Sequence, residues 1–156
     1  MPLVVYKSSA GSGKTTTLVQ AYLKITLNNP SLFRHVLAVT FTNKAANEMK
    51  ERVLDWLRIL SEGGFSKKEE LKDLQKQLGL ADDILKKRAK KLFSLIIHNY
   101  DEFSISTIDS FVHRIIKTFT TDIKLPQNFE VVIEEEEIIP EIIQDLYEKV
   151  GVDKDI

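Results

Sequence analysis

The feature that most constrains this chain is a glycine-rich turn at residues 8–15, between a short apolar run and an amphipathic segment. Gly11 and Gly13 let the backbone pass close to an anion, because without a Cβ successive N–H groups can point inward. The helix predicted to follow adds the positive end of its dipole. Lys14 and Thr15 complete the pattern G-x-x-x-x-G-K-[ST], with Ser8 in place of the first glycine. This turn is predicted to bind the phosphates of a Mg²⁺-nucleotide, with ATP expected.

Two residues of this loop have distinct chemical roles. Lys14 is expected to place its ammonium on the β- and γ-phosphates, and Thr15 to place its hydroxyl on Mg²⁺, so these are the candidate catalytic residues. The alternative is a Gly/Ser-rich turn with an incidental lysine. The candidate nucleotide-binding residues run consecutively through the loop into the helix: Ser8, Ser9, Ala10, Gly11, Ser12, Gly13, Lys14, Thr15 and Thr16.

The order of predicted elements indicates an α/β fold with a parallel sheet and right-handed crossovers. Buried strands are predicted at residues 3–6 and 35–40, and a third, short strand at 103–106. Helices are predicted at 15–27, 42–60, 67–78 and 81–98, and from Thr107 or Asp109 onward. The predicted inward side chains of the first and last helices are Leu18, Tyr22 and Ile25, and Ile108, Phe111, Val112, Ile115, Ile116 and Phe119. The predicted apolar stripe of the 42–60 helix is Ala45, Ala46, Met49, Val53, Trp56, Leu57 and Leu60, and that of the 81–98 helix is Leu85, Ala89, Leu92 and Ile96. Gly79 is predicted to separate the helices at 67–78 and 81–98. We interpret about 61–102 as a helical insertion.

Composition excludes several classes of protein. The net charge is −1 and cysteine is absent, so bulk charge does not indicate nucleic-acid binding, and disulfides and thiolate metal sites are excluded. No apolar run reaches the roughly 18 residues that a membrane span needs, and the first residues do not resemble a signal peptide. We expect a cytoplasmic protein with no membrane partner.

Polar and aromatic residues follow the second and third predicted strands. Phe41-Thr42-Asn43-Lys44 follows one strand, and Thr107 to Phe111 follows the other. Open α/β sheets place ligands at the carboxyl ends of their strands, and such groups suit phosphate contacts and base stacking. The alternative is ordinary helix capping by Thr42 and Thr107, with Phe41 and Phe111 in the core.

Three ordered segments carry a family resemblance: Ala10 to Thr15, Val39 to Arg52, and Thr107 to Phe111. They resemble motifs I, Ia and Ib of the UvrD/Rep-type superfamily 1 DNA helicases. The segment Leu125 to Phe129 also resembles the stretch after motif Ib in that family. The resemblance covers most of residues 3–133 and implies a P-loop NTPase (RecA-like) three-layer parallel sheet. It further implies ATP and Mg²⁺ as cofactors and single- and double-stranded DNA as partners.

Departures from the compact members point to one branch of that family. Only seven residues precede Ser8, so we expect the glutamine motif that reads adenine in the compact members to be absent. Thr16 stands where arginine is common, and Asp109 where histidine is common. With the helical insertion, this pattern resembles the RecB/AddA branch, the motor subunits of helicase–nucleases in DNA repair and recombination. It implies a partner nuclease, and it implies DNA contacts by Phe41, Thr42, Asn43, Lys44, Thr107 and Ser110.

The family's acidic motif and later motifs do not appear in these residues. We interpret 1–156 as the N-terminal part of the first RecA-like motor domain, incomplete, with about 120–156 beginning the next helical subdomain. Residues 129–135 are an apolar run ending in acids, either a metal-binding strand or the acidic start of a helix. Alone, the chain is expected to bind nucleotide weakly without hydrolysing it or unwinding DNA. The alternatives are a self-contained P-loop NTPase or kinase, and a nucleotide-binding module without turnover.

A basic run at residues 86–91 stands outside these motifs. It could meet DNA phosphates, and the usual interpretation is a solvated helix face opposite the apolar stripe of Leu85, Leu92 and Ile96.

Overall fold

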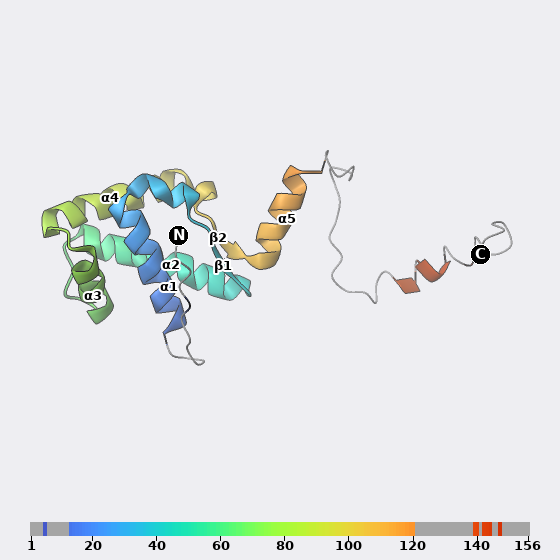
Figure 1. Cartoon of the computed structure of the whole chain (residues 1–156), viewed down its shortest axis with the longest axis horizontal. Coiled ribbons are helices and arrows are strands. Elements are labelled where there is room, and N and C mark those ends of the chain that lie inside the picture. The colour runs from blue at the N-terminus through green and yellow to red at the C-terminus, as the bar shows by residue number, and fades with distance from the viewer. Residues whose placement is uncertain (1–4, 6–12, 121–138, 141, 145–146, 148–156) are drawn as a thin grey trace. The chain divides into compact units, whose positions relative to one another are not determined.

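The structure is a computed structural model that describes residues 5, 13–120, 139–140, 142–144 and 147. The chain divides into two compact units, Met1–Phe111 and Val112–Ile156, and each is considered by itself. In the described part the elements follow one another as Figure 1 shows. They are α1 (Lys14–Asn28), the 3₁₀ helix η1 (Pro30–His35), β1 (Ala38–Thr40), α2 (Asn43–Ser61), α3 (Glu69–Leu78), α4 (Asp82–His98), the 3₁₀ helix η2 (Tyr100–Glu102), β2 (Ile105–Thr107) and α5 (Ile108–Thr118).

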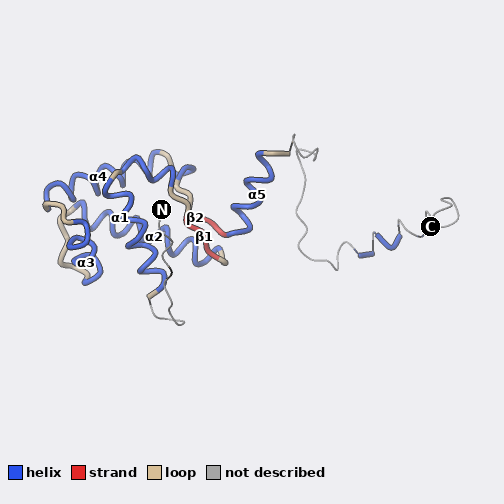
Figure 2. Tube along the Cα trace, in the orientation of Figure 1, coloured by secondary structure: helices blue, strands red, loops and turns tan. Residues whose placement is uncertain are grey.

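The described strands form a two-stranded parallel pair. β1 and β2 lie side by side in Figure 2, with Ala38 opposite Ile105 and Thr40 opposite Thr107. This confirms an α/β fold with a parallel pairing. The predicted strand at 3–6 lies outside the described residues except Val5, which is in no strand and 70% exposed.

The prediction of a buried strand at 35–40 is wrong for β1. Val39 at its centre is 42% exposed, whereas Ile105 of β2 is buried. β1 also starts later than predicted, because the 3₁₀ helix η1 extends to His35 and Leu37 remains exposed. A continuous apolar run therefore did not distinguish a strand covered on both faces from one that is open on one face.

The main core lies between α2 and α4. The apolar stripe predicted for α2 is confirmed, since Met49, Val53 and Leu57 are buried together with neighbours at helical spacing. The stripe predicted for α4 is also confirmed: Leu85, Ala89, Leu92 and Ile96 are completely buried. Both helices sit beside α1 in Figure 1, and their side chains join one cluster with those of α1.

The predicted helical insertion belongs to this same core. Leu71 and Leu74 of α3 are completely buried in the cluster that contains Val19 and Leu23 of α1. Gly79 ends α3 at φ 60°, a left-handed conformation that glycine adopts without strain. Residues 69–98 thus help to hold α1 in place.

The predicted inner face of α1 is correct for Tyr22, which is buried, and wrong for the other two residues. Leu18 and Ile25 are exposed at 46% and 42%, and the buried side runs through Val19, Leu23 and Leu27. Both faces carry apolar residues at helical spacing, so periodicity alone could not choose between them. α3 and α4 pack on α1 and decide which face is buried.

The predicted inner face of α5 is also wrong within the described residues. α5 has no buried residue: Ile108, Val112 and Ile115 are exposed, and Phe111 and Ile116 are half-buried. Phe119, which directly follows α5, is exposed as well. The amphipathic pattern predicted the helix correctly. Such a pattern shows which side of a helix is apolar, and it does not show whether that side is buried.

Candidate nucleotide and DNA site

The start of α1 is a helix end whose N–H groups no side chain caps. Gly13 is the N-cap at φ 81°, its side-chain position is open, and the first turn contains no acidic residue. The first turn of a helix leaves N–H groups without intrahelical partners. An anion can accept from these groups, and the helix dipole favours it. The residues present at this end therefore fit a phosphate group.

Lys14 and Thr15 occupy the first two positions of α1. Lys14 is exposed and Thr15 is half-buried, so both can be reached by a ligand. Thr17 donates its hydroxyl to the carbonyl of Gly13 at 3.2 Å and so leaves the N–H groups of the first turn unblocked. Ser9, Ala10, Gly11 and Ser12, predicted to complete the loop, lie outside the described residues with Ser8.

Arg52 links the start of α1 to α2. Its guanidinium donates to the Thr16 hydroxyl, with Nη1 and Oγ1 3.0 Å apart, in a partly buried position. Thr16 directly follows the predicted Mg²⁺ ligand, and Arg52 lies on the helix that begins at Asn43. Sequence reasoning missed this contact, because no local pattern indicates which residue faces Thr16 across two helices.

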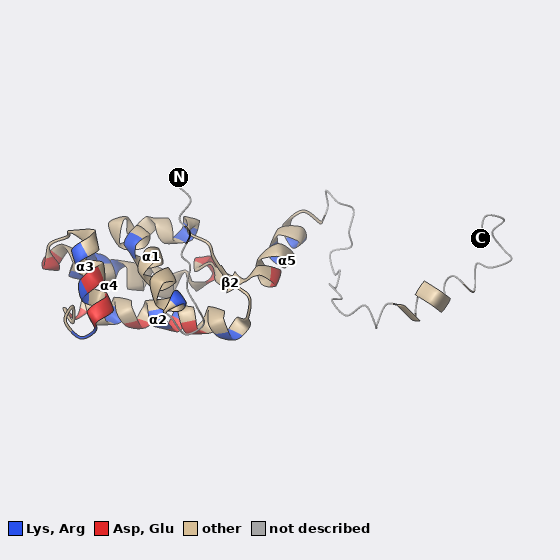
Figure 3. Cartoon of the chain, turned by 60° about the horizontal axis from the view of Figure 1, so that its bottom comes forward, with Lys and Arg blue, Asp and Glu red and all other residues tan. Residues whose placement is uncertain are grey.

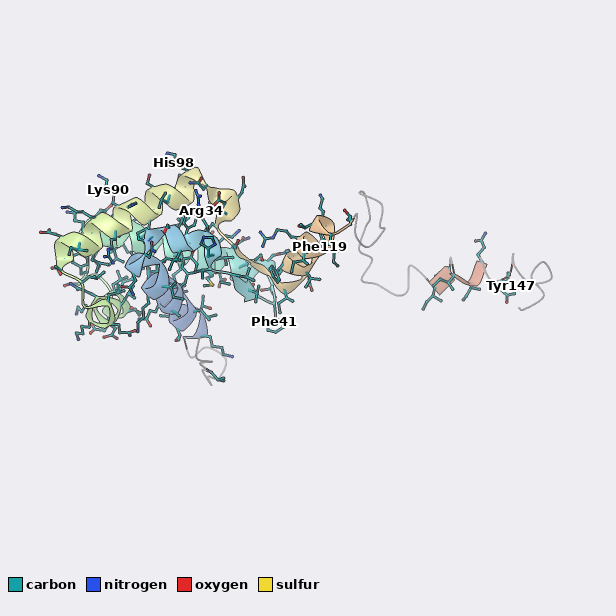
Figure 4. The ribbon with its side chains drawn as sticks, turned by 45° about the horizontal axis from the view of Figure 1, so that its top comes forward. Arg34, Phe41, Lys90, His98, Phe119 and Tyr147 are labelled. Carbon is teal, nitrogen blue, oxygen red and sulfur yellow. The ribbon has the colours of Figure 1, made fainter. Side chains whose placement is uncertain are left out.

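The start of α2 is closed by its own side chain. The Thr42 hydroxyl accepts from the N–H of Ala45 at 3.2 Å, and the Thr40 hydroxyl donates to the Thr42 carbonyl at 3.0 Å. Phe41, between these two threonines, is 88% exposed, and Figure 4 shows it at the rim of the chain, away from the helical core. The capping role considered for Thr42 is confirmed, and a core position for Phe41 is wrong.

The connection after β2 has a similar cap. Thr107 donates its hydroxyl to Ser110 Oγ at 2.7 Å and accepts from the Ser110 N–H at 3.2 Å. Thr107 is 5% exposed, so the accessible groups here belong to Ser110 and Asp109. Phe111 is half-buried, so it is neither a fully buried core residue nor a fully exposed one.

The register of the sheet brings these two connections to one edge. Thr40 and Thr107 are direct partners at the carboxyl ends of parallel β1 and β2. Phe41, Asn43 and Lys44, all exposed, therefore leave the sheet at the same edge as Ser110. An aromatic ring, a lysine and hydroxyl or amide groups together suit a nucleic-acid strand, which offers bases to stack and phosphates to pair.

The described residues contain no group of three or more His, Asp or Glu side chains that could hold a metal ion. The apolar run at 129–135, considered as a metal-binding strand, lies outside them.

Arg88, in the basic run of α4, donates to the carbonyls of Leu27 at 3.1 Å and Asn28 at 2.8 Å. It therefore closes the C-terminal end of α1, a role that its sequence neighbours did not indicate.

The described residues form a helix-rich α/β unit with a parallel strand pair, a helix with an uncapped N-terminus and capped connections at one sheet edge. The match to a helicase family model assigns this unit to the P-loop helicase fold. The chain belongs to the family of the UvrD/REP helicase N-terminal domain, whose model matches residues 2–156. Within that family it is a UvrD-like helicase sequence of the RecB/AddA type. The resemblance expected from the three motifs is thereby confirmed.

Curated relatives of this type are similar to this chain over most of its length. It is 35% identical over 151 residues to an ATP-dependent helicase/nuclease subunit of Clostridioides difficile (strain 630), covering 91% of this chain and 10% of the relative. It is 37% identical over 153 residues to the protein of the same name from Clostridium novyi (strain NT), covering 93% and 10%. A third, from Bacillus cytotoxicus, is 30% identical over 151 residues, covering 94% and 10%. The chain thus spans about a tenth of the length of these relatives.

No solved structure matches the chain. Among the described residues, no helix is long and apolar enough to cross a membrane.

Proposed function

We propose that this chain supplies the phosphate- and Mg²⁺-binding part of the ATP site, and part of the single-stranded DNA path, of an ATP-dependent DNA helicase. The observation that carries this proposal is the common sheet edge, where Thr40 and Thr107 end parallel strands in register. Phe41 follows that edge and is 88% exposed. Exposing an aromatic ring to water is unfavourable, and contact with a bound base would remove that apolar surface from water.

At the nucleotide, each of this chain's groups has one task. The open N–H groups after Gly13 and the Lys14 ammonium bind phosphate oxygens, and the Thr15 hydroxyl holds Mg²⁺. Bound Mg²⁺ would neutralise charge on the phosphates. Ser8, Ser9, Ala10, Gly11, Ser12 and Thr16 complete the proposed set.

At the DNA, Phe41 stacks on a base, while Asn43, Lys44 and Ser110 contact the phosphate backbone. Thr42 and Thr107 hold these connections rigid through their caps. Since hydrolysis needs an acidic residue to hold Mg²⁺ and an arginine from another domain, we propose that this chain alone binds nucleotide without turnover. DNA-stimulated hydrolysis by residues 1–156, abolished in Lys14→Ala, would contradict this point.

The proposal extends to the whole protein. By similarity to the helicase/nuclease relatives, we propose a DNA repair and recombination motor with a nuclease activity or partner, acting in the cytoplasm. Residues 1–156 would form the N-terminal part of its first RecA-like domain, with residues from about 120 beginning the next subdomain. Membership of a helicase family favours this function over a self-contained kinase.

The test is binding of a fluorescent oligo-dT by fluorescence anisotropy. Phe41→Ala should weaken binding by about 5- to 100-fold, because stacking of one base on an aromatic ring contributes about 1–3 kcal/mol. Phe119→Ala is the matched control, since Phe119 is also exposed, at 51%, and directly follows α5. Equal losses in both variants, or none in Phe41→Ala, would contradict the proposed DNA path.

A further inference from the structure

The structure separates the basic run of α4 into two functions. Arg88 turns inward to the carbonyls of Leu27 and Asn28, so its charge serves the end of α1. Lys86, Lys87, Lys90 and Lys91 are all exposed, on the side opposite the buried stripe. These four lysines are called the α4 basic face.

The α4 basic face is a regular array. Lys86 and Lys90 form one row, and Lys87 and Lys91 form the next, with about 6 Å of helix rise between successive members. Figure 3 shows the Lys and Arg segments of α4, and Figure 4 shows Lys90 and His98 on the outer side of the same helix. The positive charge therefore follows the helix instead of collecting at one point.

Little negative charge opposes this array. Residues 84–100 contain no Asp or Glu, although the whole chain has a net charge of −1. Among the residues that the structure describes, none of the four lysines takes part in an ion pair. The nearest acids on α4 are Asp82 and Asp83 in its first turn, where negative charge favours the helix dipole, and Asp82 also accepts from Gln75.

We propose that the α4 basic face binds the phosphate backbone of double-stranded DNA, at a surface separate from the sheet edge that carries Phe41. Charge complementarity favours a nucleic acid, since a duplex presents one phosphate for each roughly 1.7 Å of its axis. A duplex fits better than a single strand, because single-strand binding relies on aromatic stacking. The exposed large hydrophobic residues of α4 are aliphatic, Ile84 and Ile97, whereas Phe93 is half-buried.

This surface and the proposed single-strand path lie far apart on the first unit. Figure 4 places Lys90 on the outer side of α4 and Phe41 at the opposite end of that unit, beyond β1. A motor that separates strands meets duplex and single strand at different places, so two distinct contacts fit one substrate. Only the role of this surface in a strand-separating motor rests on the proposed function. Duplex binding by the α4 basic face can be measured directly and does not depend on it.

The experiment measures binding of a blunt 20-base-pair duplex to residues 1–156 at several salt concentrations. The variant carries Lys86→Gln, Lys87→Gln, Lys90→Gln and Lys91→Gln, all at exposed positions. The slope of log K against log salt should become smaller in magnitude by about 3 to 4, since each lost phosphate contact removes about 0.9. Its affinity for oligo-dT should change much less than its affinity for the duplex.

The matched control changes the net charge equally and lies outside α4: Lys24→Gln, Lys67→Gln, Lys72→Gln and Lys76→Gln. It should change the slope by less than about one. The proposal is overturned if the wild type does not bind duplex, if both variants lose equally, or if oligo-dT binding falls as much as duplex binding. Tighter lysine-dependent binding to poly-glutamate than to duplex would instead assign the surface to an acidic protein. Loss of the Phe41 effect alone would contradict the proposed single-strand path and leave this surface intact.

Discussion

The helices α1 and α2 begin in opposite ways, although each follows a segment predicted to be a strand. α2 begins at a threonine that accepts an N–H of its own first turn, and the neighbouring Phe41 is exposed on a rigid connection. α1 begins at Gly13, with no capping side chain and no acid in its first turn. A capped end positions a side chain, whereas an open end is suited to an anion. The difference teaches that a helix start can serve either as structure or as a binding site.

The largest expected effect concerns the open end. Lys14→Ala should weaken Mg²⁺-ATP binding by about 10- to 100-fold, because a charge-assisted hydrogen bond contributes about 1.5–3 kcal/mol. Its melting temperature should be unchanged, since Lys14 is exposed. Isothermal titration calorimetry measures the affinity. Lys44→Ala, a lysine in the first turn of the capped helix, is the matched control, and an equal loss there would remove the distinction between the two helix starts.

At the capped start of α2, a substitution should change the stability of the fold and leave nucleotide affinity unchanged. Thr42→Ala should lower the free energy of unfolding by about 1 kcal/mol, because Ala45 N–H loses its acceptor. Thr42→Ser retains the hydroxyl and should lose much less. Urea denaturation followed by circular dichroism measures both. Mg²⁺-ATP affinity should be unaffected, and a large loss of nucleotide binding in Thr42→Ala would show that the two helix starts are not separate in function.

The contact between the start of α1 and the middle of α2 can be measured by itself. The hydrogen bond from Arg52 to Thr16 should give a coupling energy of about 0.5 to 1 kcal/mol in a double-mutant cycle of Arg52→Met and Thr16→Val. Urea denaturation of the four proteins gives this value. Arg58→Met is the control, because Arg58 bonds to Asp55 on its own helix. It should be additive with Thr16→Val, and additivity of the Arg52 pair would contradict the contact.

The start of α3 is a third kind of helix end, and here the smallest effect is expected. Lys68 is its N-cap without a side-chain cap, and its ammonium bonds to Asp55 on α2 at 2.9 Å. That hydrogen bond is the main cause that lowers the pKa of Asp55, with the charges of Lys68 and Arg58 adding to it. A lowered folded-state pKa stabilises the fold above the unfolded value of about 3.9, and this stability is lost as the pH falls through the folded value.

Asp55→Asn should therefore lower the free energy of unfolding at pH 7 by only about 0.2–0.5 kcal/mol, because solvent screens this partly exposed pair. The difference from the wild type should shrink when the pH is lowered from 7 to below the unfolded value of about 3.9. Urea denaturation at both pH values tests this sign. A variant that is less stable than the wild type by the same amount at both pH values would show that Asp55 acts through packing rather than charge.

The local patterns of the sequence predicted the helices well. The stripe of α2 from Met49 to Leu57, the stripe of α4 from Leu85 to Ile96, and the Thr42 cap were all predicted correctly from residue spacing and type. Gly79 between α3 and α4 was predicted as a break for the same reason. Such signals act within one or two helical turns, so they do not depend on the rest of the fold.

The sequence also determined much of the candidate site. The phosphate-binding pattern through Lys14 and Thr15, and the polar connections after the two described strands, are visible as motifs in the residues alone. Two features of the site are not visible in the residues alone: the exposure of Phe41 and the hydrogen bond from Thr107 to Ser110. The exposure of a residue depends on which elements cover it.

By itself, then, the sequence determined the described α-helices, the family and the chemistry to be expected of the loop that ends at Thr15. The tertiary structure decided which face of α1 is buried, that Arg52 reaches Thr16, and that Arg88 serves α1 while its lysine neighbours remain exposed. The physical reason is distance along the chain. Helix patterns and caps arise between residues a few positions apart, whereas these contacts join residues 36 and 61 positions apart, which only packing brings together.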